Sequence, residues 1–543
     1  MLADDIKKII KGEVFTDSAT LTKFSQDASI FEVQPQVVVA PTDSADISAL
    51  VKFVSEARKF DKKLSLTPRA AGSDMSGGPL TDSIALDMTA HFNRILDITT
   101  VSAAVEPGVY YRDFDAQTKR QNVFLPSYPA SRELCTVGGM VANNSGGEKT
   151  LSYGKTENFI LELKVVLSDG NEYVIKPISK KELELKMKQK NFEGQLYKKL
   201  YEVIVKNQDV LVRAKPKVTK NSAGYYLWNV WDGEIFDLTK LIVGSQGTLG
   251  IITEIKFRLV PVKPVSKLAV IFLKDLKPLA NVALQVMKHG PESFESYDDH
   301  TIKLAIKFFP AIIKRVGTKH ILPMLVQFFP EALRMLTGGL PKLVMLAEFT
   351  GKNDEEVDKK LATLKSDLAA FPVHTRITKT EAEAKRYWII RRESFNLLRS
   401  KVKDRRTAPF IDDIVVQMEK LPEFLPNLTA LLDKYDLLYT IAGHVGDGNF
   451  HIIPLMNLAD PGQRAIIPRL SDEVYDLVVK FGGSITAEHN DGLIRTPYLE
   501  KMYGAEVVKL FAETKAIFDP ENIFNPGKKS GGSLAFSLSH VNH

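Results

Sequence analysis

The sequence contains a single cysteine, Cys135, among 543 residues. One thiol cannot form a disulfide within the chain, and such scarcity is typical of a protein from a reducing compartment. It also excludes an iron–sulfur cluster held by this chain alone, because such a cluster needs several thiolates. Neither a disulfide framework nor a set of cluster ligands is therefore expected.

Long apolar runs and a large charge excess are also missing. No uninterrupted apolar stretch reaches the roughly 20 residues that a bilayer span requires. The start, MLADDIKKIIKGEVF, has no long apolar core and no small-residue cleavage site, which disfavours a secretory signal. The net charge of +6 is small for this length and gives no support for nucleic-acid binding. We expect a cytoplasmic protein.

Positive charge is concentrated in residues 300–342, which carry the whole excess of +6. Phenylalanines accompany the basic residues, and this mixture suits peripheral attachment to an anionic membrane face. A helical insert that buries its aromatic rings within a domain explains the same composition, and both interpretations stay open. The basic residues are Lys303, Lys307, Lys314, Arg315, Lys319, Arg334 and Lys342.

The length exceeds that of one compact core, so the chain should divide into domains. An apolar run at Val37–Ala40 followed by Pro41-Thr42-Asp43-Ser44 predicts a strand and then a helix start. The PVKP run at 261–264 indicates a boundary. We expect a helical lead-in at 1–35, a first domain at 36–265, a second, α+β domain at 266–475, a segment at 476–530 that packs back on the first domain, and a disordered tail at 531–543.

Glycine-rich loops recur along the first domain: PRAAGSDMSGG (68–78), TVGGMVANNSGG (136–147) with SYGKT (152–156), and GSQGTLGIITE (244–254). Glycine has no Cβ to block the approach of a phosphate, and exposed N–H groups stabilise its charge. No loop reads G-x-G-x-x-G before a helix, and Glu148 interrupts the only P-loop-like stretch, so neither common nucleotide motif is present. Any one loop alone is better explained as a tight turn.

Taken together and in this order, the loops resemble the FAD-binding domain of the vanillyl-alcohol-oxidase/p-cresol-methylhydroxylase superfamily of flavoproteins. The likeness is greatest to its branch of FAD-linked D-2-hydroxy-acid dehydrogenases, which act on D-lactate, glycolate or D-2-hydroxyglutarate. It runs from about Gln36 to Lys528. The resemblance implies an α+β fold class, with a two-part FAD-binding domain of the p-cresol-methylhydroxylase type and an α+β, ferredoxin-like substrate or cap domain.

The same resemblance implies which residues contact FAD. Gln246 stands where the family often has glutamate. His91 matches no flavin-linking position, so noncovalent FAD is expected. The pyrophosphate would lie against Pro68, Arg69, Ala70, Ala71, Gly72, Ser73 and Ser76; the rest of the cofactor against Gly138, Gly139, Ala142, Asn143, Ser145, Gly146 and Tyr153; the flavin near Pro126, Ser127 and Asn525; and the adenosine end against Ile252.

Two histidines flank a hairpin signal in His444-Val-Gly-Asp-Gly-Asn-Phe-His451. Apolar residues on both sides predict two strands, and Asp447-Gly448 predicts a two-residue turn. That turn would place His444 directly opposite His451 on one face, with Cβ atoms about 5 Å apart. Such a pair suits chelation of one metal ion. A hairpin that carries two histidines with no metal remains the alternative.

Glu488-His489, in GGSITAEHNDG (482–492), supplies further candidates. Adjacent extended residues point in opposite directions, so one can bind metal while the other faces substrate. The resemblance implies His444, His451 and Glu488 as metal ligands and His489 as general base. This donor set suits Zn²⁺, the first candidate, or Mn²⁺ or Fe²⁺. Many relatives read EHGIG; the form EHNDG resembles the branch fused to iron–sulfur domains, whose cysteines this chain lacks.

An anionic substrate needs a cationic anchor. Trp388-Ile-Ile-Arg391 matches the W-x-x-R element that supplies this arginine in the family. Without that match, Arg391 would be interpreted as an ordinary surface charge on a helix. Arg392 is a rival and Arg495 a second anchor. Where D-2-hydroxyglutarate enzymes offer a further lysine, this chain has Phe410-Ile411-Asp412-Asp413, which favours a substrate without a second carboxylate, such as D-lactate.

These features predict an FAD-linked dehydrogenase that oxidises a small D-2-hydroxy acid to the 2-oxo acid. The electrons would pass to a quinone, a cytochrome, an electron-transfer flavoprotein or a separate iron–sulfur subunit. Two other functions remain: a noncatalytic flavin-binding subunit of a larger oxidase, and a redox-neutral enzyme resembling alkylglycerone-phosphate synthase. The histidine and glutamate set disfavours both.

Overall fold

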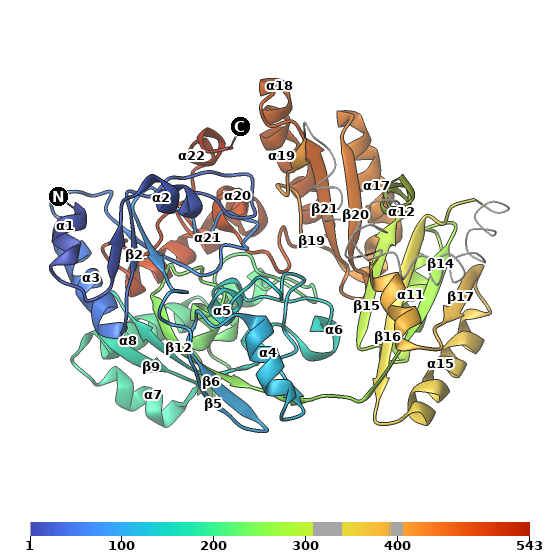
Figure 1. Ribbon diagram of the computed structural model, residues 1–543, viewed down its shortest axis with the longest axis horizontal. Helices are drawn as coiled ribbons and strands as arrows, with labels where there is room; N and C mark the ends of the chain where they lie inside the picture. The colour runs from blue at the N-terminus through green and yellow to red at the C-terminus, as the bar shows by residue number, and fades with distance from the viewer. Residues whose placement is uncertain (1, 308–338, 390, 392–404, 543) are drawn as a thin grey trace.

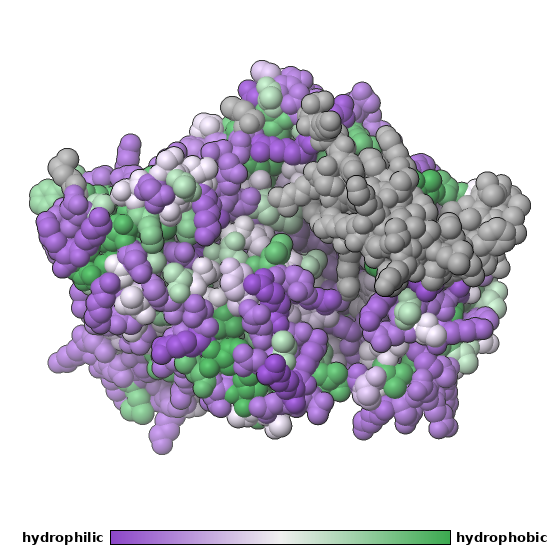
Figure 2. Space-filling view, viewed as in Figure 1, coloured by the Kyte–Doolittle hydropathy of each residue, from purple (hydrophilic) through white to green (hydrophobic). Residues whose placement is uncertain are grey.

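The computed structural model describes residues 2–307, 339–389, 391 and 405–542. Most of the basic segment 300–342 and the rival anchor Arg392 lie outside the described residues. Two lobes stand side by side, the first blue to green with red C-terminal helices, the second yellow to orange (Figure 1). Polar residues cover most of the visible face, and apolar ones gather in small groups (Figure 2). Among the described residues, no helix has both the length and the apolar character needed to cross a membrane.

The first sheet of the first lobe has the strand order β1-β2-β4-β3, with β2, β4 and β3 parallel. Asp43 accepts a hydrogen bond from Asp46 N and begins α3, whose apolar stripe is buried against the sheet, as the helix-start signal predicts. β3 ends where the first glycine loop begins. The elements are α1 Leu2–Lys7, β1 Glu13–Phe15, α2 Ser18–Phe24, β2 Val37–Ala40, α3 Ser44–Ala57, β3 Leu66–Arg69 and β4 Ile84–Asp87.

The lead-in at 1–35 is therefore not wholly helical, because β1 pairs antiparallel with β2. β1 has three residues, too few to show the alternation of polar and apolar side chains that marks a strand in a sequence. Its pairing with β2 stabilises it.

The second sheet of the first lobe is antiparallel, in the order β5-β6-β12-β8-β9. The C-terminal helix α21 packs into its core through Leu510, Phe511 and Phe518, so the two ends of the chain build one lobe (Figure 1). The elements are β5 Ile95–Ile98, β6 Ser102–Val105, α4 Tyr111–Lys119, β7 Val123–Phe124, α5 Val137–Asn143, α6 Thr150–Tyr153, β8 Ile160–Val166, β9 Glu172–Ile175, β10 Ile178–Ser179, α7 Lys180–Met187, α8 Phe192–Lys206, α9 Gln208–Ala214, β11 Ile235–Phe236, α10 Thr239–Ile242, β12 Ile251–Arg258, β13 Val260–Pro261, α20 Gly492–Arg495 and α21 Leu499–Phe518.

The second lobe is built on an eight-stranded sheet. Its β14-α11-β15-β16-α15-β17 part has the antiparallel order β17-β14-β16-β15, which is the expected ferredoxin-like arrangement. β20, β21 and β18 continue the sheet from β15, and β19 also pairs with β21. The elements are β14 Val265–Leu273, α11 Leu279–Lys288, β15 Ser293–Asp298, α12 Asp299–Lys307, β16 Leu343–Gly351, α15 Asp354–Leu368, β17 Val373–Ile377, β18 Arg406–Thr407, β19 Ile414–Val415, α17 Leu421–Leu432, β20 Leu438–His444, β21 Asn449–Met456, α18 Pro461–Arg464 and α19 Ile466–Lys480.

The prediction of a disordered tail at 531–543 is wrong. Ser533 accepts a hydrogen bond from Phe536 N and begins α22, Leu534–Ser539. Val541 is buried and bridges to Phe31, while Asn542 N donates to Ile30 O. One apolar residue with a partner far away in sequence is enough to hold a segment whose composition resembles a linker.

Candidate active site

The glycine loops converge, as expected for one binding site. Gln246 joins them: its Nε2 donates to Ser76 Oγ at 3.1 Å and its backbone N to Ala142 O at 2.9 Å. Asn525 Nδ2 donates to Gly78 O at 2.9 Å and to Gln246 O at 2.7 Å. Loops 68–78, 136–147 and 244–250 are thus bound to one another and to the C-terminal segment.

Individual residues of the predicted cofactor set have distinct environments. Gly72 has a φ of +69°, a left-handed conformation that favours glycine in the loop. The Arg69 guanidinium donates to Phe24 O at 3.0 Å and Gln26 O at 2.6 Å. Arg69 therefore anchors the turn after α2 with its side chain and leaves only its backbone to the loop.

The remaining positions lie around α5 and β12. Ser127 is buried and within 3.2 Å of Thr156 Oγ1, which also donates to Ser145 O at 2.9 Å. The Tyr153 hydroxyl donates to Glu292 of the second lobe at 3.3 Å, so this side chain spans the lobes. Ile252 lies on β12 opposite Val165, in the strand that follows the third loop.

The histidine hairpin is formed by β20 and β21, but its register differs from the predicted one. Ala442 pairs with His451 and His444 with Asn449, so the turn spans residues 445–448. Gly448 closes it with a φ of +70°, where a Cβ would lie 1.9 Å from Val416 O. A shift of two residues keeps the face, because side chains alternate with a period of two. The two imidazoles are diagonal neighbours, with ring centroids 5.3 Å apart.

The segment 486–489 lies against this hairpin. His489 stacks on His451 with ring centroids 4.9 Å apart, and Glu488 Oε1 lies 3.5 Å from His444 Nε2. One ligand atom from each of Asp413, His451, Glu488 and His489 lies within 4.8 Å of the others. The prediction that Glu488 and His489 point in opposite directions is therefore wrong, because this segment is a bend and not an extended strand.

Asp413 organises that bend. Its Oδ2 accepts from the backbone N–H groups of Ala487, Glu488 and His489 at 2.9, 2.8 and 2.7 Å. Its Oδ1 accepts from Asn449 Nδ2 at 3.1 Å. Both oxygens already accept hydrogen bonds, so Asp413 acts as a scaffold for the segment.

Asp412 is shared by two imidazoles. Its Oδ1 lies 3.1 Å from His451 Nδ1 and its Oδ2 lies 2.8 Å from His489 Nδ1. Partners at Nδ1 leave Nε2 of each ring for metal or substrate. Although burial lowers the pKa of His489, the carboxylates of Asp413 and Asp412 raise it to about 9.

Glu295 on β15 was missed by sequence reasoning. Its Oε1 lies 2.5 Å from His444 Nδ1 and its Oε2 lies 2.6 Å from Arg391 Nη2. Burial lowers the pKa of His444, but the Glu295 carboxylate raises it to about 9. Glu295 therefore connects a predicted metal ligand with the predicted substrate anchor. No local motif marks it; only the pairing of β15 with β20 brings it here.

Arg495 was predicted as a second carboxylate anchor. Its guanidinium is fully buried, and its two Nη atoms donate to Asn490 O at 2.8 Å and Asp412 O at 2.6 Å. These bonds tie Arg495 to the backbone of the two segments that carry Asp412 and His489.

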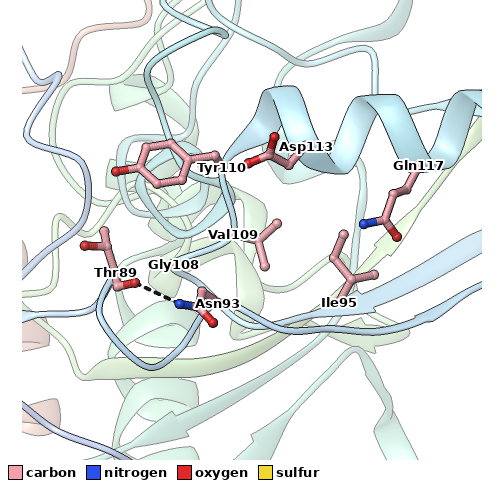
Figure 3. Close-up of a pocket in the computed structure, with 8 residues that line it drawn as sticks. All are labelled: Thr89, Asn93, Ile95, Gly108, Val109, Tyr110, Asp113 and Gln117. Atoms are coloured by element: carbon pink, nitrogen blue, oxygen red, sulfur yellow. Dashed lines mark hydrogen bonds between the residues drawn. The ribbon is translucent and has the colours of Figure 1, made fainter.

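A surface cavity of about 400 Å³ lies elsewhere on the first lobe (Figure 3). It shares no residue with the glycine loops or the histidine cluster. Its lining residues are Thr89, Asn93, Ile95, Gly108, Val109, Tyr110, Asp113 and Gln117.

Comparisons with known proteins agree with this architecture. Residues 35–175 match the FAD binding domain model, and residues 262–529 match the model for the C-terminal domain of FAD linked oxidases. The chain belongs to the family of FAD-linked oxidoreductases that combine these two domains.

Its curated relatives include proteins of the branch that the glycine loops resemble. The D-2-hydroxyglutarate dehydrogenase of Pseudomonas putida is 29% identical over 525 residues, covering 95% of this chain and 50% of that protein. The glycolate oxidase subunit GlcD of Bacillus subtilis is 27% identical over 544 residues, covering 97% of both chains. The chain thus spans about half the length of the hydroxyglutarate enzyme.

A solved structure of p-cresol methylhydroxylase has a TM-score of 0.68 at 17% identity, covering 97% of this chain and 96% of that chain. This likeness confirms the expected fold.

Proposed function

We propose that this chain is a dehydrogenase that uses noncovalent FAD to oxidise a small D-2-hydroxy acid to the 2-oxo acid. The observation that supports this most directly is the contact between the two halves of the site. Asn143, in the second glycine loop, donates through Nδ2 to Glu488 O at 3.1 Å. Asn490 Nδ2 donates back to Asn143 O at 3.2 Å and to Gly244 O at 2.9 Å. The histidine cluster is therefore held against the FAD loops.

The metal ligands in this proposal are His444, His451 and Glu488. Two imidazole nitrogens and one carboxylate oxygen fit a divalent transition metal, with Zn²⁺ first and Mn²⁺ or Fe²⁺ as alternatives. When bound, the ion polarises the substrate hydroxyl and FAD accepts the hydride.

The chain's own groups supply the remaining chemistry. Arg391, oriented by Glu295, binds the substrate carboxylate. His489, oriented by Asp412, takes the hydroxyl proton at Nε2 when its imidazole is neutral, as the C2–H bond breaks and its electron pair leaves as hydride. The products are the 2-oxo acid, reduced cofactor and the proton held by His489.

A small substrate is favoured because this chain has Phe410-Ile411-Asp412-Asp413 in the segment where D-2-hydroxyglutarate enzymes, by resemblance, offer a further lysine. The relative from Pseudomonas putida is named for D-2-hydroxyglutarate, so that acid is the second candidate. Electrons would then pass to a quinone, a cytochrome, an electron-transfer flavoprotein or a separate iron–sulfur subunit.

Anaerobic reduction of the bound flavin tests the proposal without an assumed acceptor. D-lactate, L-lactate, glycolate and D-2-hydroxyglutarate are each mixed with FAD-loaded protein, and the oxidised-flavin absorbance is followed. We expect D-lactate or glycolate to bleach it fastest. Fastest bleaching by D-2-hydroxyglutarate would select the second candidate. No bleaching by any acid would contradict the dehydrogenase and favour the noncatalytic or redox-neutral functions.

Peripheral binding to an anionic membrane through residues 300–342 is a separate proposal that rests on composition alone. Each basic residue near such a surface contributes about 1 kcal/mol. We expect salt-sensitive sedimentation with anionic vesicles and none with neutral ones. Protein that stays in the supernatant at low salt contradicts it.

A further inference from the structure

Lys220 is a fully buried cation inside the proposed metal site. Its ammonium lies 2.9 Å from Asp447 Oδ2 and donates to Glu488 Oε1, and its side chain is 0% exposed. Both carboxylates pair with the ammonium in the protein interior. Such a cation is tolerated in the interior because it is paired.

The lysine engages the Glu488 oxygen that lies next to His444. Glu488 Oε1, the oxygen that accepts from Lys220, lies 3.5 Å from His444 Nε2. A divalent ion held between His444 and Glu488 would therefore stand next to the ammonium. Because the effective dielectric constant is lower around a fully buried side chain than in water, their repulsion is stronger there than at the surface.

Asp447 offers the lysine a second partner. It lies in the turn of the β20–β21 hairpin, where Thr219 Oγ1 donates to its backbone O at 2.7 Å. The same short segment, residues 219–220, thus holds both the turn and the ligand carboxylate. When Glu488 engages a metal, Asp447 can still neutralise the ammonium.

We propose that Lys220 is a positioning residue that competes with the metal ion for Glu488, and that Asp447 limits this competition by retaining the lysine. The proposal rests on the proposed function, since it takes His444, His451 and Glu488 as the ligands. It predicts opposite effects for two neighbouring substitutions, whereas damage to the fold would weaken metal binding in both.

Metal affinity measured without turnover tests the proposal. Full-length protein loaded with FAD and stripped of metal is titrated separately with Zn²⁺ and Mn²⁺ against a competing chelator. We expect Lys220→Met to bind metal at least about 10-fold more tightly than the unaltered chain, because the competing charge is gone. We expect Asp447→Asn to bind at least about 10-fold more weakly, because Lys220 then depends on Glu488 alone.

Lys515→Met is the matched control. Lys515 is also buried and paired, but with Asp519 and with the carbonyls of Thr248 and Phe524. Its loss should lower stability and leave the metal affinity unchanged. The melting temperature with and without Zn²⁺ gives a second readout: metal should raise it more in Lys220→Met than in the unaltered chain.

The outcomes separate this proposal from the proposed function. Equal or weaker metal binding in Lys220→Met overturns the competition and leaves the dehydrogenase intact. If that variant does not fold, unchanged or tighter binding in Asp447→Asn overturns it. An unaltered chain that binds neither ion overturns both the competition and the metal-assisted part of the proposed function.

Discussion

Glu295 shows how one carboxylate organises two functions at the residue scale. It is 1% exposed and contacts His444 through one oxygen and Arg391 through the other. A buried carboxylate of this kind orients a ligating imidazole and increases its basicity. Its neutralisation should therefore affect metal binding and substrate binding together.

Glu295→Gln keeps the size of the side chain and removes its charge. We expect metal affinity to fall about 10–100-fold, the usual effect of losing such a partner. KM should rise because Arg391 loses the group that orients it. Chelator competition and anaerobic flavin reduction measure the two effects. Glu254→Gln, which breaks the Lys164–Glu254 pair on β12, is the control and should change neither.

His489 is the second test at this scale. His489→Ala should slow flavin reduction by about 10²–10⁴-fold, the usual contribution of a general base. FAD and metal content should be unchanged, because His489 belongs to neither ligand set. His91→Ala, which removes a surface histidine paired with Glu13, is the control. Near-normal reduction by His489→Ala would remove this residue from the mechanism.

At the scale of the element, the β20–β21 hairpin carries two of the proposed metal ligands, His444 and His451, and the glycine loops carry the proposed FAD contacts. The second glycine loop contacts the segment 488–490, which lies against the hairpin, through hydrogen bonds of Asn143 and Asn490. Metal and cofactor binding should therefore be separable by mutation.

His451→Ala tests this separation. We expect metal content and turnover to fall while FAD stays bound, because the glycine loops keep all their hydrogen bonds. Metal analysis and flavin absorbance of the same sample measure both. A parallel loss of flavin and metal would mean that the hairpin is needed for the structure of the FAD site.

At the scale of the molecule, a buried ion network joins the lobes. Lys149, next to the second glycine loop, lies 2.7 Å from Glu292 and from Glu348 of the second lobe. Lys263 also pairs with Glu292 at 2.6 Å. The network holds the cap beside the FAD domain, so it fixes how the histidine cluster faces the cofactor.

Lys149→Met should destabilise the protein by about 3–5 kcal/mol, because it removes the buried ammonium that lies 2.7 Å from both Glu292 and Glu348, and among the described residues Glu292 then keeps only the more exposed Lys263 as a cationic partner. Lys164→Met, which breaks a more exposed pair, should cost no more than about 1 kcal/mol. Melting temperatures of the two variants compare them. Equal melting temperatures would show that the interlobe network contributes nothing.

The sequence by itself determined the features that depend on local patterns. The helix start at Asp43, the three glycine loops and the common face of His444 and His451 follow from residue type and spacing. The prediction that His444 and His451 share a face is correct although the predicted register is not, because a shift of two residues leaves side-chain direction unchanged. The length of the turn depends instead on the close contact of Gly448 with Val416.

Only the tertiary structure decided which partners the site residues have. Ser296 pairs with Gly443, which sets Glu295 beside His444; Asp413 gathers the backbone of 487–489; and Lys220 reaches Glu488 across 268 positions of the chain. These contacts join segments that are distant in the sequence and are brought together by the order of the strands and the packing of the lobes. No local propensity encodes such proximity, so a buried acid or lysine reveals its partner only in the folded molecule.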